Sequence, residues 1–113
     1  TEINVGNDSH TIDALYDVIV SRKGADPETS YTAKLFHQGR PEIAKKLGEE
    51  AAELMVASLS QGRSEVISES ADVLYHLSVL WAEQGVTPAE VWAELNRREG
   101  TSGIEEKNSR TTD

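Results

Sequence analysis

The sequence has no cysteine and no long apolar run, and each absence excludes a class of protein. Without cysteine there is no disulfide framework, no thiolate nucleophile and no cysteine metal site. No stretch approaches the roughly 18 consecutive apolar residues of a membrane-spanning helix. Strand-like alternation of apolar and polar residues is also missing, as are internal repeats, so the sequence predicts an all-α fold.

Positive charge is in short supply, with 11 Lys and Arg against 20 Asp and Glu and a net charge of −9. A protein that binds duplex DNA or RNA normally has a basic face, so nucleic acid is not an expected partner. A phosphorylated substrate would need metal cations beside this many carboxylates. The polar N-terminal residues show no signal peptide, and with the lack of cysteine we expect a cytoplasmic protein.

With 113 residues the chain is expected to form one domain with a limited core, for which a homodimer is a reasonable expectation. We divide it into a flexible N-terminus (1–8), an all-α domain (9–99) and a polar C-terminal tail (100–113). Helix signals predict a first helix of about fifteen residues capped by Asp8 or Ser9, and a short helix capped by Ser30. Two long helices follow, Pro41 to Ser60 and a partner capped by Ser64, and then a last helix that begins with a capping box at Thr87. The expected architecture is an antiparallel helical bundle centred on the hairpin of the two long helices and completed by dimerisation.

The two long helices carry carboxylates in a fixed rhythm. The first has Glu49, Glu50 and Glu53, and the second has Glu69 and Asp72. At 100° per residue, Glu50 and Glu53 stand one turn apart at the edge of an expected core stripe. That stripe comprises Ile43, Leu47, Ala51, Leu54 and Ser58.

The second long helix is apolar nearly all round between Ala71 and Ala82, where only Asp72, His76 and Ser78 are polar. Such a helix is buried on most faces, and an ionised Asp on it must be paired or bind metal. Counting from a turn near Gly62, Glu53 should face Asp72, and Glu50 and Glu69 should lie one turn away. Four carboxylates can therefore share one volume, and oxygen ligands of this kind suit Mg²⁺.

Two alternatives to this metal site remain open. Acidic pairs three or four residues apart are common on solvated helices, so the carboxylates can be a plain surface. A di-iron bundle is the competing metal site, but it needs repeated Glu-x-x-His motifs, and His76 has no second copy.

The motifs together resemble one enzyme family. Segments 30–32 (Ser-Tyr-Thr), 46–53 (Lys-Leu-Gly-Glu-Glu-Ala-Ala-Glu) and 69–76 (Glu-Ser-Ala-Asp-Val-Leu-Tyr-His) look like those of phosphoribosyl-ATP pyrophosphatases. Those enzymes belong to the MazG-like all-α NTP pyrophosphatases. The acidic motif alone indicates this superfamily, whereas the Ser-Tyr-Thr segment and the Gly-Ile-Glu-Glu-Lys tail at 103–107 point to the particular family.

The resemblance implies a Mg²⁺-dependent, homodimeric hydrolase of histidine biosynthesis that splits phosphoribosyl-ATP into phosphoribosyl-AMP and pyrophosphate. It implies that Glu50, Glu53, Glu69 and Asp72 are metal ligands. Glu49 would be an additional ligand, support the ligands or help to activate water. The alternatives are a MazG-type housecleaning NTP pyrophosphatase and, from another class, a non-catalytic helical interaction module.

Several polar residues near the carboxylates are candidates for binding substrate. Lys46 shares the face of Glu50 and Glu53 and is the strongest of the basic residues, although any of them can be a solvated side chain. Ser30, Tyr31 and Thr32 stand at a helix N-terminus, a natural phosphate site, or form a simple cap. His76 can contact substrate or be a packed histidine. The remaining candidates are Lys45, Arg22, Lys23, Lys34, Arg40 and the tail residue Lys107.

Overall fold

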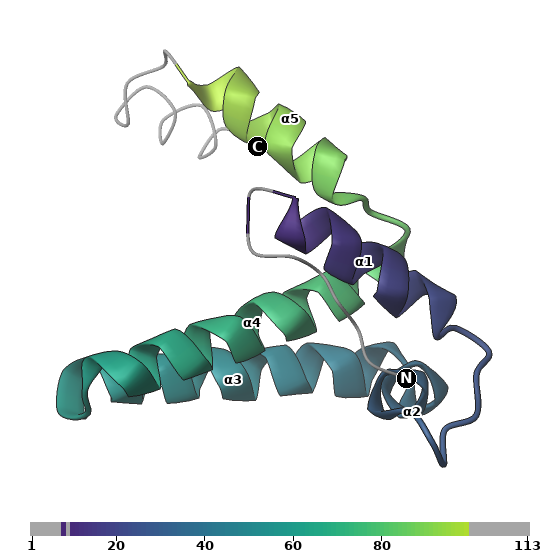
Figure 1. Cartoon of the computed structure of the whole chain (residues 1–113), viewed down its shortest axis with the longest axis horizontal. Helices are drawn as coiled ribbons and strands as arrows, with labels where there is room; N and C mark the ends of the chain where they lie inside the picture. The colour runs from purple at the N-terminus through teal and green to yellow at the C-terminus, as the bar shows by residue number, and fades with distance from the viewer. Residues whose placement is uncertain (1–7, 9, 100–113) are drawn as a thin grey trace.

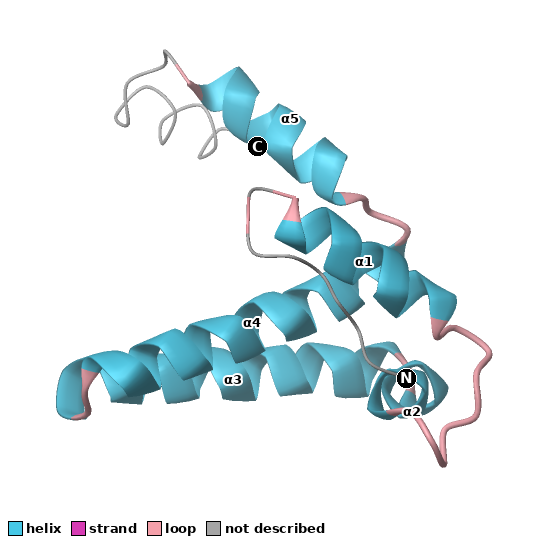
Figure 2. Cartoon of the chain, viewed as in Figure 1, coloured by secondary structure: helices cyan, strands magenta, loops and turns pink. Residues whose placement is uncertain are grey.

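The computed structural model describes residue 8 and residues 10–99, and all secondary structure in this part of the chain is helical. Figure 2 shows the five helices and their connecting loops. They are α1 (Thr11–Ser21), α2 (Tyr31–Gln38), α3 (Arg40–Ser60), α4 (Arg63–Gln84) and α5 (Pro88–Arg98). The prediction of an all-α fold is confirmed for these residues. No helix in this part is both long and apolar enough to cross a membrane.

The two longest helices, α3 and α4, lie side by side and are joined by a tight connection at Gln61 and Gly62 (Figure 1). Helix α1 packs on α4, α2 packs on α3, and α5 contacts α1. The buried core lies at the end of the α3–α4 pair away from this connection, where α1 and α2 cover it. Its buried members are Ile19, Leu35, Ile43, Val79 and Ala82.

The buried positions of α3 follow a repeat of seven residues. Ile43 and Ala57 are 1% and 0% exposed, and Glu50, midway between them, is partly buried. The predicted core stripe is wrong at Ala51 and Ser58, which are both exposed. The predicted stripe advanced by 3.75 residues per step on average, whereas two helices that wrap around each other pack at steps averaging 3.5.

On both α3 and α4, a line of buried or partly buried residues follows spacings that alternate between three and four residues. We call the residues of these two lines, which face each other along the hairpin, the seam. Two of its ten members, one on each helix, are glutamates. The seam comprises Ile43, Leu47, Glu50, Leu54 and Ala57 of α3 and Val66, Glu69, Val73, His76 and Leu80 of α4.

Local signals at the helix ends are mostly confirmed. The Ser30 hydroxyl accepts the Ala33 amide at 3.1 Å, and Thr87 forms the expected capping box with Glu90. Gly85 ends α4 in the left-handed conformation, with φ of 74°. These contacts satisfy backbone groups that a helix terminus leaves unpaired.

Two predicted caps are wrong. Helix α4 begins at Arg63, before Ser64, and the Gly62 amide donates to the Glu65 carboxylate at 3.0 Å. Helix α1 begins at Thr11 and has 11 residues, because the Asp8 carboxylate accepts the His10 amide in a local turn. The Glu65 contact is of the capping-box kind, in which a glutamate at the third helical position accepts the amide of the cap residue. The Asp8 contact belongs to a local turn of the kind that short polar residues favour.

Two basic residues form polar contacts between different helices near the helix ends. Lys23 Nζ donates to the Ala82 carbonyl near the end of α4 at 2.6 Å and lies 5.5 Å from the centre of the Phe36 ring. Arg40 pairs with Glu83 at 2.7 Å. Both residues were candidates for holding phosphate, and the structure gives them contacts within the fold instead.

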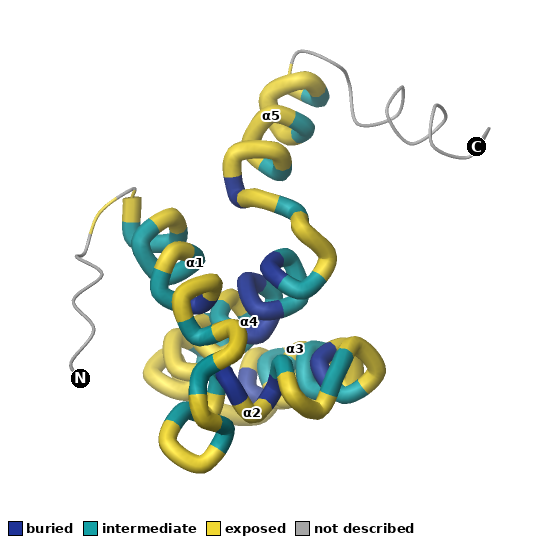
Figure 3. Tube along the Cα trace, turned by 90° about the vertical axis from the view of Figure 1, so that its right-hand side faces the viewer, coloured by how far each residue is buried: buried dark blue, intermediate teal, exposed yellow. Residues whose placement is uncertain are grey.

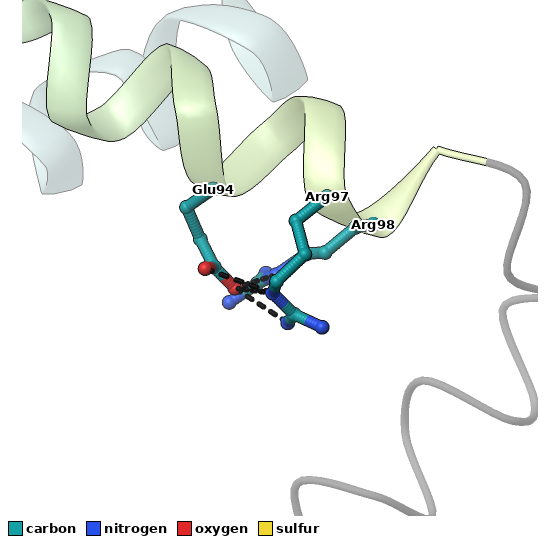
Figure 4. Close-up of polar contacts among 3 residues, drawn as sticks. All are labelled: Glu94, Arg97 and Arg98. Atoms are coloured by element: carbon teal, nitrogen blue, oxygen red, sulfur yellow. Dashed lines mark hydrogen bonds and ion pairs between the residues drawn. The ribbon is translucent and has the colours of Figure 1, made fainter.

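Helix α5 projects away from the hairpin, as Figure 3 shows, and it is mostly exposed. Trp92 stands edge-on to Trp81 of α4, with ring centres 6.1 Å apart. The Glu94 carboxylate accepts hydrogen bonds from Arg97 and Arg98 (Figure 4), and these arginines lower its pKa to about 2. The tail that follows, including Lys107, lies outside the described residues.

Gly39 provides the first test, because it sets the angle between α2 and α3. Its φ of 95° and ψ of 177° belong to a region that only glycine adopts readily. Gly39→Ala should lower the free energy of unfolding by about 1–3 kcal/mol. Gly48→Ala, an exposed α3 position whose added methyl group meets no atom within 4 Å, is the matched control and should raise it by up to about 1 kcal/mol. Urea unfolding measures both, and equal effects of the two variants would contradict the argument.

Candidate metal centre

The carboxylate centre, made of Glu50, Glu53, Glu69 and Asp72, lies where glutamates occupy seam positions. Glu50 of α3 and Glu69 of α4 occupy seam positions and are partly buried, and Glu53 and Asp72 stand one turn from them at its exposed edge. Each helix therefore contributes one seam carboxylate and one edge carboxylate. Glu49 is exposed on α3 and pairs with Lys46, with 3.6 Å between Oε1 and Nζ.

Three of these side chains already lie at nearly ligand spacing. Glu50, Glu69 and Asp72 each offer an oxygen, and these oxygens are within 4.8 Å of one another. Two oxygens bound to one Mg²⁺ at about 2.1 Å are at most about 4.2 Å apart. Small side-chain rotations would therefore bring all three onto one ion.

Buried oxygens at this centre lack hydrogen bonds. Oε2 of Glu50 and Oε2 of Glu69 are buried and have no hydrogen-bond partner among the described residues. Buried polar atoms are nearly always paired, so such atoms need an explanation. A bound cation would satisfy both, and an all-oxygen donor set is the one that Mg²⁺ prefers.

The electrostatics agree with this assignment. Burial, followed by the closeness and the negative charge of the Glu53 carboxylate, raises the pKa of Glu50 from its ordinary 4.5 to about 7. Burial and the charges of Glu53 and Asp72 also raise the pKa of Glu69. The carboxylates are thus close enough to repel one another, and a divalent cation would remove this repulsion.

The register of the hairpin differs from the prediction. The oxygen cluster pairs Asp72 with Glu50, where the sequence argument placed Glu53. Because α3 ends at Ser60 and α4 starts at Arg63, the midpoint lies between Gln61 and Gly62. About this midpoint, Glu50 lies opposite the helical turn that contains Asp72. Glu53 lies opposite the helical turn that contains Glu69.

A hollow of about 320 Å³ opens beside the carboxylates. Glu53 and Glu69 line it, and the rest of its wall comes from the end of α3 and the turn. It lies directly beside two of the predicted metal ligands. The lining residues are Ala52, Glu53, Val56, Gln61 and Glu69.

The predicted basic residues are dispersed. Lys46 is partly buried near the carboxylates, and Lys45 is exposed on the same helix. Arg22 stands at the C-terminal cap of α1. Lys46 is therefore the candidate that the structure places best for contact with a phosphate.

Tyr31 and His76 connect α2 to the carboxylate helix. His76 is 6% exposed, with Nδ1 2.9 Å from the backbone oxygen of Asp72 and Nε2 3.4 Å from the Tyr31 hydroxyl. Because a carbonyl only accepts, Nδ1 carries the proton and Nε2 accepts from Tyr31. His76 is thus a packed histidine that reaches the centre through Asp72.

The contacts of Tyr75 and the hollow beside α2 were not predicted from the sequence. The Tyr75 hydroxyl is hydrogen-bonded to Thr32, and its ring centre lies 6.2 Å from that of Tyr31 and 4.9 Å from that of His76. A second hollow, of about 640 Å³, lies over the start of α2 and has Ser30, Tyr31 and Lys34 in its wall. Tyr75 follows Leu74 within the acidic motif, but periodicity alone could not show that α2 packs against it.

Comparisons with known proteins identify the family of this chain. A family model described as phosphoribosyl-ATP pyrophosphohydrolase matches residues 12–99. A phosphoribosyl-ATP pyrophosphatase of Paramagnetospirillum magneticum is 63% identical over 106 residues, which cover 94% of this chain and 97% of that protein. One from Rhodospirillum rubrum is 66% identical over 99 residues, covering 88% and 85%. One from Trichlorobacter lovleyi is 50% identical over 106 residues, covering 94% and 98%.

These matches extend across the described helices and confirm the resemblance found in the sequence motifs. They include both acidic segments and the Ser-Tyr-Thr segment. The chain therefore belongs to the phosphoribosyl-ATP pyrophosphohydrolase family and is an enzyme, a hydrolase.

Proposed function

We propose that this enzyme hydrolyses phosphoribosyl-ATP to phosphoribosyl-AMP and pyrophosphate in histidine biosynthesis, with Mg²⁺ as its cofactor. The names of its relatives support the substrate. The single observation that supports the metal is the pair of buried, unpartnered oxygens of Glu50 and Glu69 with Asp72 in reach. Water adds across the anhydride bond between the α and β phosphates, so one bond to phosphorus breaks and one forms.

The residues of the chain have distinct roles in this proposal. Glu50, Glu53, Glu69 and Asp72 would hold the cation, and the hairpin fixes their spacing. When bound, Mg²⁺ supplies positive charge that offsets the phosphate oxygens and makes a water molecule more acidic. Lys46 adds a positive charge beside Glu49 and Glu50, where the triphosphate approaches. Phosphoryl transfer depends mainly on such positioning and charge.

A homodimer is part of the proposal. The turn end of the hairpin carries exposed apolar side chains on both helices, and Leu59 is 81% exposed. A cluster of this kind marks an interaction surface, and a second copy of the chain can cover it by self-association. The residues concerned are Met55, Val56, Leu59, Ile67 and Leu74, which are 44–81% exposed.

The activity test uses purified protein, Mg²⁺ and phosphoribosyl-ATP, with pyrophosphate release as the readout. We expect turnover that disappears with a chelator and returns with Mg²⁺, and slower turnover of ordinary NTPs and dNTPs. Faster turnover of dNTPs would instead favour a housecleaning pyrophosphatase, and activity without metal would contradict the proposed centre.

In the same assay, Glu53→Gln and Asp72→Asn should keep the helical circular dichroism spectrum and lower turnover at least a hundredfold, about 2.7 kcal/mol of barrier. Each variant removes a charged ligand without changing side-chain volume. Asp17→Asn, an exposed carboxylate on α1, is the control and should keep wild-type turnover. Wild-type rates in both site variants would exclude this metal site.

Stability should depend on pH through Glu50. Its pKa is about 7 in the fold and 4.5 ordinarily, so between these values the folded protein binds a proton that the unfolded chain has released. In metal-free protein the free energy of unfolding should therefore fall as pH rises from about 4.5 to about 7. Mg²⁺ should offset this loss at pH 8 much more than at pH 5.5.

Thermal unfolding in chelator and in Mg²⁺ across this range measures the effect, with Glu50→Gln as the comparison. This variant lacks the titrating group, so its unfolding should be less sensitive to pH and to Mg²⁺. Identical pH profiles for the two proteins would show that the Glu50 carboxyl does not titrate in this range.

Self-association is tested by sedimentation velocity at micromolar concentrations. The wild type should sediment as a dimer, and Leu59→Glu should shift it toward monomer, because a charge at an apolar interface is not compensated. Ser68→Glu, an exposed polar position on α4, is the control expected to remain dimeric. A monomeric wild type would contradict the proposal.

A further inference from the structure

The larger hollow, over the start of α2, differs in character from the carboxylate centre. Its volume of about 640 Å³ is twice that of the hollow beside Glu53. It is formed by the loop between α1 and α2 and by the exposed face of α2. Its lining residues are Pro27, Glu28, Thr29, Ser30, Tyr31, Lys34, His37 and Gln38.

Cationic and hydroxyl groups face this hollow in a chain that is otherwise strongly acidic. Lys34 and His37 stand one turn apart on α2, and neither forms an ion pair with any described residue. The Ser30 hydroxyl accepts the Ala33 amide, so its own proton can be donated to a ligand. Glu28 is the one carboxylate in the lining, and it is exposed.

The substrate of the proposed function has phosphate at both ends. One end is the triphosphate, which in the proposed function binds at the carboxylate centre through Mg²⁺. The other is the phosphate monoester of the added ribosyl group, which carries nearly two negative charges at neutral pH. Charge-assisted hydrogen bonds from Lys34, with Ser30 and His37 as further donors, suit such a group.

We propose that this hollow binds the sugar phosphate of the phosphoribosyl group and so distinguishes the substrate from ordinary nucleoside triphosphates. This inference rests on the proposed function. A site that hydrogen-bonds a polar group discriminates strongly against analogues that lack it, because its own polar groups are then left unpaired. An NTP would reach the metal carboxylates and leave the hollow empty.

The Tyr31–His76 contact joins the hollow to the helix that carries Glu69 and Asp72. Tyr31 lines the hollow, its hydroxyl bonds His76 Nε2, and His76 Nδ1 bonds the backbone oxygen of Asp72. Two hydrogen bonds thus connect the wall of the hollow to the backbone of Asp72, whose side chain belongs to the carboxylate centre. His76 is buried, so this connection lies inside the fold.

The experiment compares phosphoribosyl-ATP with ATP as substrates of the full chain in Mg²⁺. Lys34→Met should raise KM for phosphoribosyl-ATP roughly tenfold or more and leave kcat within about twofold. The reason is that Lys34 binds the sugar phosphate equally well in the ground state and in the transition state. The low kcat/KM for ATP should not change. Lys34→Arg should restore most of the affinity, and Glu28→Gln should lower KM because it removes the opposing charge.

Equal losses for ATP and phosphoribosyl-ATP in Lys34→Met, or an unchanged KM, would overturn the proposal. A second readout does not depend on hydrolysis. Ribose 5-phosphate should show saturation-transfer NMR signals with the wild type, ribose should not, and Lys34→Met should abolish them. If the wild type released no pyrophosphate from phosphoribosyl-ATP, the proposed function would fail, whereas absent binding of ribose 5-phosphate would contradict the hollow alone.

Discussion

Two glutamates occupy positions where a helical hairpin ordinarily has apolar side chains, and the candidate metal centre depends on that placement. Glu50 and Glu69 interrupt the seam between α3 and α4, each with a buried oxygen that has no hydrogen-bond partner in the described part of the chain. Such groups cost stability unless a partner satisfies them. Burial and the neighbouring carboxylates also raise the pKa of Glu50, so that its ionised form is disfavoured when no cation is present.

The stability of the fold therefore comes from a different place. The buried core lies at the end of the hairpin covered by α1 and α2, and Ile43 and Val79 belong to both the core and the long helices. Lys23 adds a hydrogen bond to the end of α4 and a contact with Phe36. This separation allows the carboxylates to be poorly satisfied without loss of the fold, which is a common trade between activity and stability.

Much of this architecture could be predicted from local signals, and the failures have physical reasons. Ser30, Gly39, Gly85 and Thr87 acted as expected, because caps and positive-φ glycines depend on neighbouring residues alone. The side of α3 that is buried could not be read correctly with a straight-helix period, since Ala51 and Ser58 drift out of a seam that repeats every 3.5 residues. In the heptad register, Glu50 and Glu69 fall in the seam. The Thr32–Tyr75 and Tyr31–His76 contacts join residues more than 40 positions apart, and no periodicity encodes them.

The carboxylates also divide the hairpin into two halves with different surroundings. On one side of them α1 and α2 cover the seam, and on the other side Leu59 and Ile67 remain 81% and 57% exposed. Among the described residues the remaining helix, α5, contacts α1 and lies away from the turn end (Figure 1). Under the proposed dimer, the second copy would cover the turn end, exclude water from the carboxylates and strengthen their attraction for a cation. Assembly and metal binding would then depend on each other through the same short stretch of α3 and α4.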